Sequence, residues 1–386
     1  MQKIIYIAGF RQHAGKTFTS LGIISRLREV YSPNEIGYIK PVGQELFTLP
    51  DGRKIDKDAI IIKEYALPSL NLDTVSPVRL GRGVTKSYLE SQDQELLTKE
   101  YCRSIDEAIS KLKDKKIIIA EGTGHPGVGG IVNLSNSDVS IRLNSDIIYL
   151  AGGGIGKTLD MLEVDLNYFH SKGARVKGII FNKLIPNKID DMKKHITEEY
   201  ITKRFSKDGS PIHILGWMPE VKGLNKPSMR LIKKSFQNAI IAGDSDETQW
   251  NRPVTGVTII SQSYKKVNPQ ENVKAGSVII LSSNSLRRLK KILVYTKSQA
   301  PQDRIAGFIF TCTKKQESFP KSLKLVTNYK VPAIYVREDT STADEILYKC
   351  IKNTKLQSHE TKKSDQIIKA FKENFDLEKF KNSFLG

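Results

Sequence analysis

The feature that most constrains this 386-residue sequence is a glycine-rich segment near its start, GFRQHAGKT at residues 9–17. An Ile-rich run at Lys3–Ala8 precedes it, and a helical apolar period over Thr17–Val30 follows it. A turn between a buried strand and a helix presents backbone N–H groups at the helix N-terminus, where they can bind phosphate. Gly15 lets the backbone approach a ligand closely, and Lys16 is expected to neutralise phosphate oxygens. The segment predicts a phosphate-binding loop; a glycine-rich turn with an exposed lysine is the alternative.

The rest of the first 222 residues alternates between strand-like runs and helical periods. The runs are rich in Ile and Val, and several lack polar alternation, which is typical of parallel strands covered on both faces. We expect these strands at Lys3–Ala8, Ile36–Val42, Lys116–Ala120, Asp146–Ala151, Val176–Phe181 and Ile212–Trp217. The pattern predicts an α/β fold, a doubly wound and mostly parallel sheet of the P-loop NTPase class, over residues 1–222.

A second, smaller α/β domain is expected after a break in this pattern. Residues 223–252 are interpreted as a linker with a helix at Met229–Ile241, and the second domain as residues 253–360. Residues 361–386 predict a charged, amphipathic C-terminal helical tail. The strands expected in the second domain are Val257–Ile260, Ser277–Leu281, Ala306–Phe310 and Ala333–Val336, with a helix at Ser285–Lys297.

Oxygen ligands for a magnesium ion follow two of the first-domain strands. Glu121 comes directly after a buried strand, and α/β sites lie at this carboxyl end. Asp56 and Asp58 lie past the second strand, and a helix N-cap is the alternative role for either aspartate. The Thr17 hydroxyl is the third expected ligand, because the residue after the loop lysine coordinates magnesium in phosphate loops.

A second Gly-Lys-Thr occurs in the segment at residues 152–158, GGGIGKT. It also follows a strand, but Ala151 stands where the common motif has its first glycine. We interpret it as a turn bordering the first site or the substrate, with a second phosphate loop as the alternative.

Six segments in the same order resemble dethiobiotin synthetase and its relatives in the cobyrinic acid a,c-diamide synthase group. The resemblance implies that Lys40 holds a substrate or its carbamate, and that Asn182 contacts adenine. It also implies ATP and Mg²⁺ as ligands, with Asp58, Glu121 and Thr17 on the metal, and it makes a homodimer plausible. The phosphate would be bound by Gly9, His13, Ala14, Gly15, Lys16 and Thr17. The matching segments are Gly9–Thr17 with its five intervening residues, Gly37–Val42, Asp58-Ala59, Glu121–Gly124, Gly178–Asn182 and Leu215–Pro219.

The second domain resembles the DRTGG domain that follows such an ATPase domain in long bacterial phosphate acetyltransferases. The similarity is strongest at Val331–Val336 and Asp339–Ala343. The motif that gives the DRTGG domain its name is absent. Ser282–Asn284 stands where the family has Gly-Asp-Arg, and Thr311–Thr313 stands where it has Thr-Gly-Gly. A ligand function of this domain is therefore not expected. Transacetylase activity is not expected either, because this sequence has no room after the second domain for the acetyltransferase catalytic domain.

Net charge, sequence motifs and cysteine content bear on whether the protein binds nucleic acid or membranes and on its compartment. The net charge is +19, but the lysines are interpreted as spread along the whole chain, with pairs such as Lys290-Lys291 on solvated helix faces. No nucleic-acid motif, signal peptide or long apolar span is found, so nucleic acid is an unlikely partner and no membrane contact is expected. Three dispersed cysteines favour a reducing cytoplasm.

Two main functions remain open. One is an ATP-dependent ligase that activates a carboxylate or carbamate by phosphoryl transfer, with Lys16 and Lys40 as catalytic residues. The other is a regulatory ATPase or nucleotide sensor. The small-molecule substrate is unknown.

Overall fold

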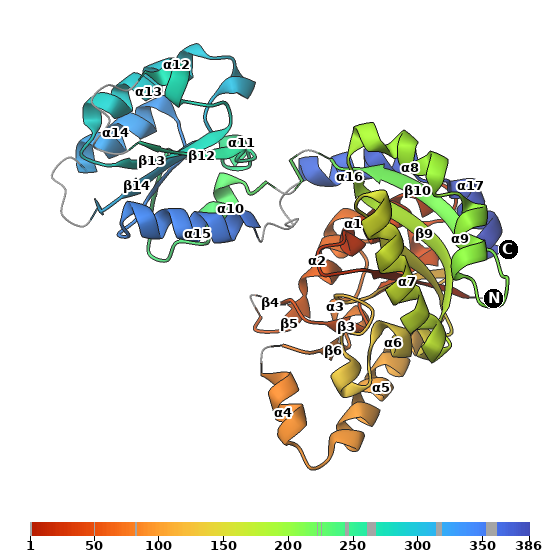
Figure 1. Ribbon diagram of the computed structural model, residues 1–386. Coiled ribbons are helices and arrows are strands. Elements are labelled where there is room, and N and C mark those ends of the chain that lie inside the picture. Colours follow the sequence, from red (N-terminus) through yellow and green to blue (C-terminus); the bar gives the residue numbers. More distant parts are fainter. Residues whose placement is uncertain are drawn as a thin grey trace. The chain divides into compact units, whose positions relative to one another are not determined.

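The computed structural model describes residues 2–49, 51–81, 83–221, 223–224, 226–243, 247–260, 268–313, 319–352 and 361–386. The chain divides into two compact units, labelled by element in Figure 1. Unit 1 joins Met1–Val221 to Gln357–Gly386, and unit 2 comprises Lys222–Leu356. No helix in the described part of the chain is both long and apolar enough to cross a bilayer.

Unit 1 is built on a six-stranded sheet in the order β10-β9-β8-β1-β7-β2, and every neighbouring pair is parallel. Its central strands are almost wholly buried, which explains their unbroken Ile and Val runs. The predicted doubly wound α/β fold is confirmed. The strands are β1 (Lys3–Gly9), β2 (Ile36–Ile39), β7 (Ile117–Glu121), β8 (Asp146–Ala151), β9 (Arg175–Leu184) and β10 (His213–Pro219).

Helices cover both faces of this sheet. The face that carries Tyr6 and Ala8 packs against α5, α6 and α7, whereas α1, α2 and α16 lie on the other. Short strand pairs flank the sheet: β3 (Val42–Gly43) with β6 (Val78–Arg79), and β4 (Leu46–Thr48) with β5 (Lys54–Asp56). The helices are α1 (Lys16–Leu27), α2 (Lys57–Tyr65), α3 (Leu72–Val75), α4 (Val84–Glu90), α5 (Gln94–Ser110), α6 (Asn136–Arg142), α7 (Ile155–Lys172), α8 (Ile189–His195), α9 (Glu198–Phe205), α16 (Thr361–Asn374) and α17 (Leu377–Phe380).

The C-terminal segment belongs to unit 1 rather than forming a separate tail. The Phe371 ring of α16 lies against Gly22 of α1, where a Cβ atom would come within 2.2 Å of the ring. The Asp376 N–H donates to the Leu215 carbonyl at 2.9 Å. The amphipathic helix was predicted, but the surface that its apolar face covers was not.

Unit 2 is a five-stranded sheet in the order β11-β15-β14-β13-β12, parallel except for β11. Helices α12, α13 and α14 cover one face, and α10, α11 and α15 cover the other. The strands are β11 (Ile240–Ala242), β12 (Gly256–Ile260), β13 (Ser277–Ser282), β14 (Gly307–Thr311) and β15 (Ala333–Tyr335). The helices are α10 (Met229–Lys233), α11 (Glu247–Trp250), α12 (Pro269–Asn272), α13 (Leu286–Ser298), α14 (Phe319–Tyr329) and α15 (Thr340–Lys352).

The helix expected over Met229–Ile241 is shorter than predicted. It ends at Lys233, and Ile240–Ala242 instead pairs antiparallel with β15. Asn238 between them has a left-handed φ of 55°, which a helix cannot continue through, and the β-branched Ile240 and Ile241 suit a strand. The described parts of residues 223–252 therefore add two short helices, α10 and α11, and the edge strand β11 to unit 2.

Candidate nucleotide site

The loop between β1 and α1 has a fixed geometry that depends on Gly15. This residue precedes α1 with a left-handed φ of 100°, and a Cβ atom here would lie 2.3 Å from Asn182 Nδ2. Asn182 Nδ2 donates to the Ala14 carbonyl at 2.9 Å, and Lys183 Nζ donates to the His13 carbonyl at 2.8 Å. The end of β9 thus holds the glycine-rich loop from one side. Asn182, predicted to contact adenine, lies directly on this loop.

Lys16 is the first residue of α1, and its side chain is buried although it is charged. Its Nζ donates to the Arg11 carbonyl at 3.1 Å and to the Gly124 carbonyl at 2.8 Å. The ammonium group therefore lies between the glycine-rich loop and the loop after β7. Its position at the N-terminus of α1 suits a phosphate group, because the first N–H groups of a helix have no intrahelical partner.

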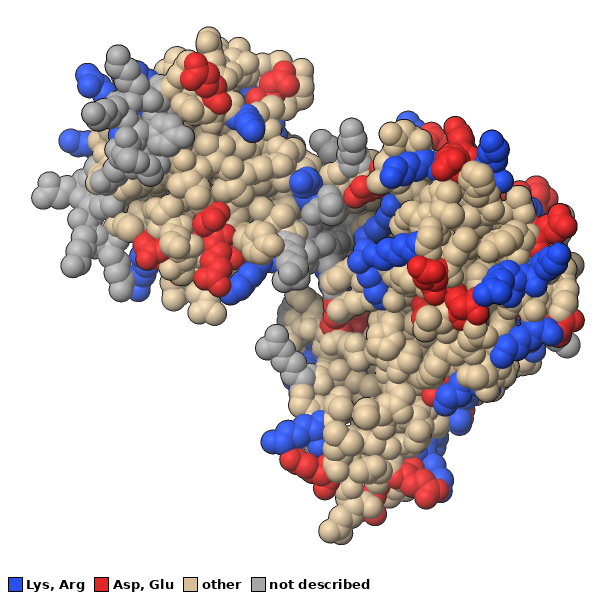
Figure 2. All heavy atoms as spheres, in the orientation of Figure 1, with Lys and Arg blue, Asp and Glu red and all other residues tan. Residues whose placement is uncertain are grey.

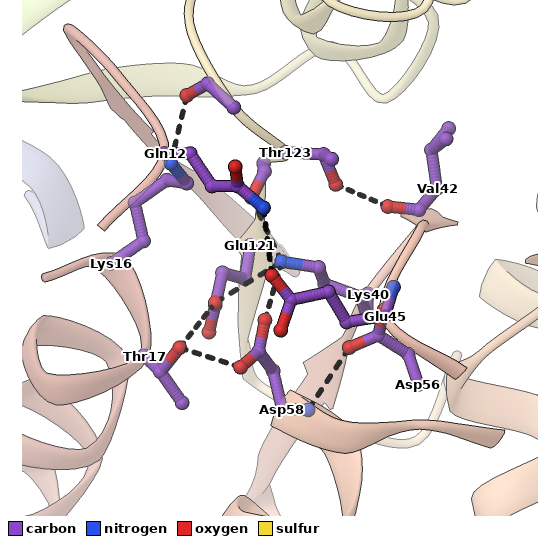
Figure 3. Close-up of polar contacts among 12 residues, drawn as sticks. Gln12, Lys16, Thr17, Lys40, Val42, Glu45, Asp56, Asp58, Glu121 and Thr123 are labelled. Atoms are coloured by element: carbon purple, nitrogen blue, oxygen red, sulfur yellow. Dashed lines mark hydrogen bonds and ion pairs between the residues drawn. The ribbon is translucent and has the colours of Figure 1, made fainter. Parts of the chain in front are cut away.

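Four predicted site residues meet beside this loop, although each comes from a different element (Figure 3). Thr17 Oγ1 lies 2.8 Å from Asp58 Oδ1 and 3.0 Å from Glu121 Oε1. Lys40 Nζ donates to Asp58 Oδ2 at 2.9 Å, to Glu121 Oε1 at 3.2 Å and to the Gly122 carbonyl at 2.9 Å. The ends of β2 and β7 are neighbours in the sheet, so their carboxyl-terminal residues converge.

The side chains of Lys40, which is buried, and Asp58, which is partly buried, stay charged because they form an ion pair. Burial would raise the pKa of Asp58, but the Lys40 ammonium and the hydrogen bonds to this carboxylate lower it to about 2. Burial alone would lower the pKa of Lys40, and the two carboxylates raise it instead. Burial raises the pKa of Glu121, against the opposing effect of Lys40. A protonated lysine beside an ionised Asp58 is therefore the ground state of the site.

Asp56 and Asp58 have different roles. Asp56 is buried and caps α2, accepting a hydrogen bond from the Asp58 N–H at 2.9 Å. Burial and the neighbouring Asp58 charge raise the pKa of Asp56 to about 7. The N-cap alternative thus describes Asp56, whereas the Asp58 side chain faces Thr17.

The donor set at this point fits a magnesium ion. The possible metal ligands are all oxygens, and Thr17 Oγ1 lies within hydrogen-bond distance of both the Asp58 and the Glu121 carboxylate. Among the described residues, no group of three or more His, Cys, Asp or Glu side chains forms an all-protein metal cage. Magnesium in phosphate-binding sites typically uses one or two carboxylates together with phosphate and water, so these three residues suffice.

Two buried residues that the sequence did not identify, Tyr38 and Asn136, hold Glu121 and the loop that follows it in place. The Tyr38 hydroxyl donates to Glu121 Oε2 at 3.0 Å. Asn136 accepts from the Tyr6 hydroxyl at 2.9 Å and donates to the Thr123 and His125 carbonyls at 2.8 and 2.6 Å. Tyr38 lies two residues before Lys40 in the same predicted strand segment, so strand alternation was a usable signal for it. Asn136 had no such signal.

The second Gly-Lys-Thr lies beside the first loop but differs in structure. Gly152 packs against the Asn182 carbonyl, and α7 begins at Ile155, before the lysine. Lys157 is exposed, whereas Thr158 is buried and its hydroxyl has no hydrogen-bond partner. This turn borders the first loop without presenting its lysine as Lys16 is presented.

The segments that replace the DRTGG motif lie at strand ends in unit 2. Ser282 Oγ donates to Asn284 Oδ1 at 2.9 Å at the end of β13. Thr311 Oγ1 lies 3.2 Å from Thr340 Oγ1 at the end of β14. These contacts are internal to unit 2, and the resemblance to DRTGG domains stays a prediction.

Comparison with known proteins agrees with the fold of unit 1. Two ATP-dependent dethiobiotin synthetases, from Clostridium perfringens strain 13 and strain ATCC 13124, are each 26% identical over 246 residues, covering 58% of this chain and 94% of theirs.

Solved structures that match part of this chain include the septum site-determining protein MinD of Pyrococcus horikoshii, in complex with Mg-ADP. Its TM-score is 0.33 at 16% identity, over 58% of this chain and 84% of that one. The signal recognition particle receptor FtsY of Elizabethkingia anophelis, in complex with GDP, has a TM-score of 0.32 at 11% identity, over 57% of this chain and 58% of that one.

The AAA domain family AAA_26 matches residues 3–228, which is more than half of the chain. This range contains the glycine-rich loop, Lys40, both acidic residues and Asn182. The chain therefore belongs to the AAA domain family, and unit 1 carries its P-loop nucleotide-binding fold.

Proposed function

We propose that unit 1 is an Mg-ATP-dependent enzyme that transfers the γ-phosphoryl group to a carboxylate or carbamate. The observation that carries this proposal is Lys40, a buried second lysine held by Asp58, Glu121 and the Gly122 carbonyl. A P-loop needs only Lys16 to bind phosphate, so Lys40 adds a cation where an anionic acceptor would approach. The dethiobiotin synthetase relatives support this assignment, since they are named as ATP-dependent synthetases.

Each side chain has a distinct part in the proposed reaction. Lys16 and the loop N–H groups bind the phosphate chain, and Asn182 contacts the adenine. Thr17, Asp58 and Glu121 hold magnesium, which when bound reduces the charge on the phosphate oxygens. Lys40 orients the acceptor carboxylate and stabilises the charge that develops on the transferred group.

The proposed transfer needs no protein nucleophile. An acceptor carboxylate oxygen attacks the γ-phosphorus, the bond to the bridging oxygen breaks, and ADP leaves. An amine then attacks the acyl carbon of the mixed anhydride, inorganic phosphate leaves, and the nitrogen loses a proton. The fold therefore supplies position and electrostatic stabilisation rather than a covalent intermediate.

A regulatory ATPase is the second candidate, and one observation favours it. Residues 361–386 follow unit 2 in the chain and pack on α1, the helix that begins with Lys16. In that case, unit 2 would respond to the nucleotide state of unit 1. We also propose that the protein is a homodimer, which light scattering of the purified chain would test.

A phosphate-release screen separates the two candidates. Wild-type protein with Mg-ATP is tested alone and with carboxylates, diamines and bicarbonate. We expect slow release alone and clear stimulation by one acceptor class, lost in Lys40→Met. The matched control Lys157→Met, in the second Gly-Lys-Thr, should keep the stimulation. Release that no acceptor stimulates, and that Lys40→Met leaves unchanged, would instead support the regulatory function.

A further inference from the structure

The positive charge of this protein is concentrated in unit 2. Residues 222–356 hold 24 Lys and Arg against 10 Asp and Glu, so this unit accounts for +14 of the net +19. The 251 residues of unit 1 carry the remaining +5. The lysines and arginines do lie along the whole chain, 37 in unit 1 and 24 in unit 2, but 32 of the 42 acidic residues belong to unit 1, so the net charge is unevenly distributed.

Helix α13 presents much of this charge on one side. Arg287, Lys290, Lys291 and Lys297 are exposed, while Leu289, Ile292 and Leu293 are buried against the sheet. The basic positions are three, four and seven residues apart, so they form a stripe along the solvent face of the helix.

Helix α14 continues the basic surface. It packs beside α13 on the same face of the sheet, and its Lys321 and Lys324 are exposed. Lys297 Nζ of α13 lies 5.5 Å from the centre of the Tyr329 ring of α14, which joins the two helices at one end. We call the surface formed by Arg287, Lys290, Lys291, Lys297, Lys321 and Lys324 the α13–α14 basic face.

Within the part of the chain that the structure describes, no carboxylate pairs with the cations of this face. Neither helix contains an acidic residue. The opposite side of unit 2 differs, because α15 carries Asp344 and Glu345, and Glu345 pairs with Lys349 at 2.6 Å. Figure 2 shows acidic side chains at the lower edge of unit 2, where Figure 1 labels α15, and also at its upper edge near α12.

Uncompensated cations side by side repel one another unless a polyanion neutralises them. The apolar sides of α13 and α14 are buried in unit 2, and Val294 is the one large apolar side chain that the described parts of the two helices leave exposed. A single valine is not the continuous apolar face that inserts into a lipid surface. The aromatic rings of Phe319 and Tyr329 pack against the core rather than forming an open stacking platform for single-stranded bases. Duplex DNA, with one charge per about 1.7 Å, needs only such cationic contacts.

We propose that the α13–α14 basic face binds the phosphate backbone of duplex DNA without reading its sequence. The α13–α14 basic face consists of five lysines and one arginine, and contacts of such side chains with phosphate oxygens hold a protein on the duplex without carrying sequence information. The interaction therefore depends on salt and is insensitive to sequence. It is independent of the reaction proposed for unit 1.

Fluorescence anisotropy of a labelled duplex of about 24 base pairs, titrated with the full chain between about 50 and 200 mM NaCl, tests the proposal. The variant is Lys290→Gln/Lys291→Gln/Lys297→Gln. The control is Lys86→Gln/Lys99→Gln/Lys203→Gln, three exposed lysines of unit 1 that remove the same total charge. Circular dichroism checks that both variants keep the fold.

We expect the α13 variant to weaken binding at least about tenfold at 100 mM salt and to reduce the salt slope by about 0.9 per lost contact. The control should change the affinity less than about twofold. Equal losses in both variants would overturn the proposal, since total charge would then explain the binding. Tighter binding to single strands, or to vesicles of phosphatidylcholine with phosphatidylserine, would also overturn it.

Discussion

The two Gly-Lys-Thr sequences of this chain have the same residues but different structures. In the first, Gly15 precedes the helix, so Lys16 opens α1 and Thr17 faces two carboxylates. In the second, α7 begins at Ile155, and its lysine and threonine are the third and fourth helical residues. Lys157 points into solvent, and the Thr158 hydroxyl is buried without a partner.

The difference shows that a phosphate loop is defined by register and surroundings. The helix must begin at the lysine, so that the lysine and the free N–H groups lie at the same point. Acidic residues from neighbouring strand ends must also reach the threonine. Asp58 and Glu121 meet this condition for Thr17, and no described carboxylate does so for Thr158.

Replacement of Lys16 or Lys157 by alanine should give the largest difference between the two Gly-Lys-Thr sequences, measured as Mg-ATP affinity. We expect Lys16→Ala to weaken Mg-ATP binding by at least about 100-fold, because charge-assisted contacts of about 1.5 kcal/mol each are lost. Lys157→Ala should leave the affinity within about twofold, since its side chain is exposed. Isothermal titration calorimetry measures both. An equal loss in the two variants would mean that the second turn also binds phosphate.

Replacement of Gly15 and of Gly156, the glycines of the two Gly-Lys-Thr sequences, by alanine should have opposite effects on stability. Gly15→Ala forces a Cβ atom to 2.3 Å from Asn182 Nδ2 at a left-handed φ, and should destabilise unit 1 by about 1–3 kcal/mol. Gly156→Ala meets no atom within 4 Å in a helix, and should stabilise it by about 0.5–1 kcal/mol. Urea unfolding gives the two free energies. Destabilisation by Gly156→Ala would show that the second turn requires glycine.

The two threonines should give the smallest but most specific contrast. Thr17→Val removes a proposed magnesium ligand. The gain in ATP affinity that magnesium gives should therefore fall by about tenfold, which corresponds to about 1.4 kcal/mol. Thr158→Val removes a buried hydroxyl without a partner, and should stabilise the fold by about 1 kcal/mol. Titration of magnesium at fixed ATP tests the first effect. Thermal unfolding tests the second, and a lower melting temperature would reveal a partner for this hydroxyl.

Most of the strands of unit 1, the glycine-rich loop and Glu121 could be predicted from local sequence patterns. The parallel strands were predictable because both faces are buried, which leaves Ile- and Val-rich runs with little alternation. The loop and Glu121 were predictable because they directly follow such runs. The Ile240–Ala242 strand was not, because three residues at a sheet edge leave almost no periodic signal.

Contacts between distant residues were harder to foresee. Asn136 holds the loop after β7 through the Thr123 and His125 carbonyls, and it is itself held by the Tyr6 hydroxyl, 130 residues away in the sequence. Nothing local marks such an asparagine, since its role exists only once the chain has folded. The same applies to Phe371, whose apolar helix face was evident but whose contact with Gly22 was not.

The packing of Phe371 on Gly22 has a consequence for the order of events during synthesis. Helix α1 leaves the ribosome before unit 2, but α16, which covers it, leaves after all of unit 2. Domains generally fold as they are made, so unit 2 can complete its own sheet before α16 packs on α1. Synthesis of the nucleotide-binding unit therefore begins before unit 2 and is completed after it.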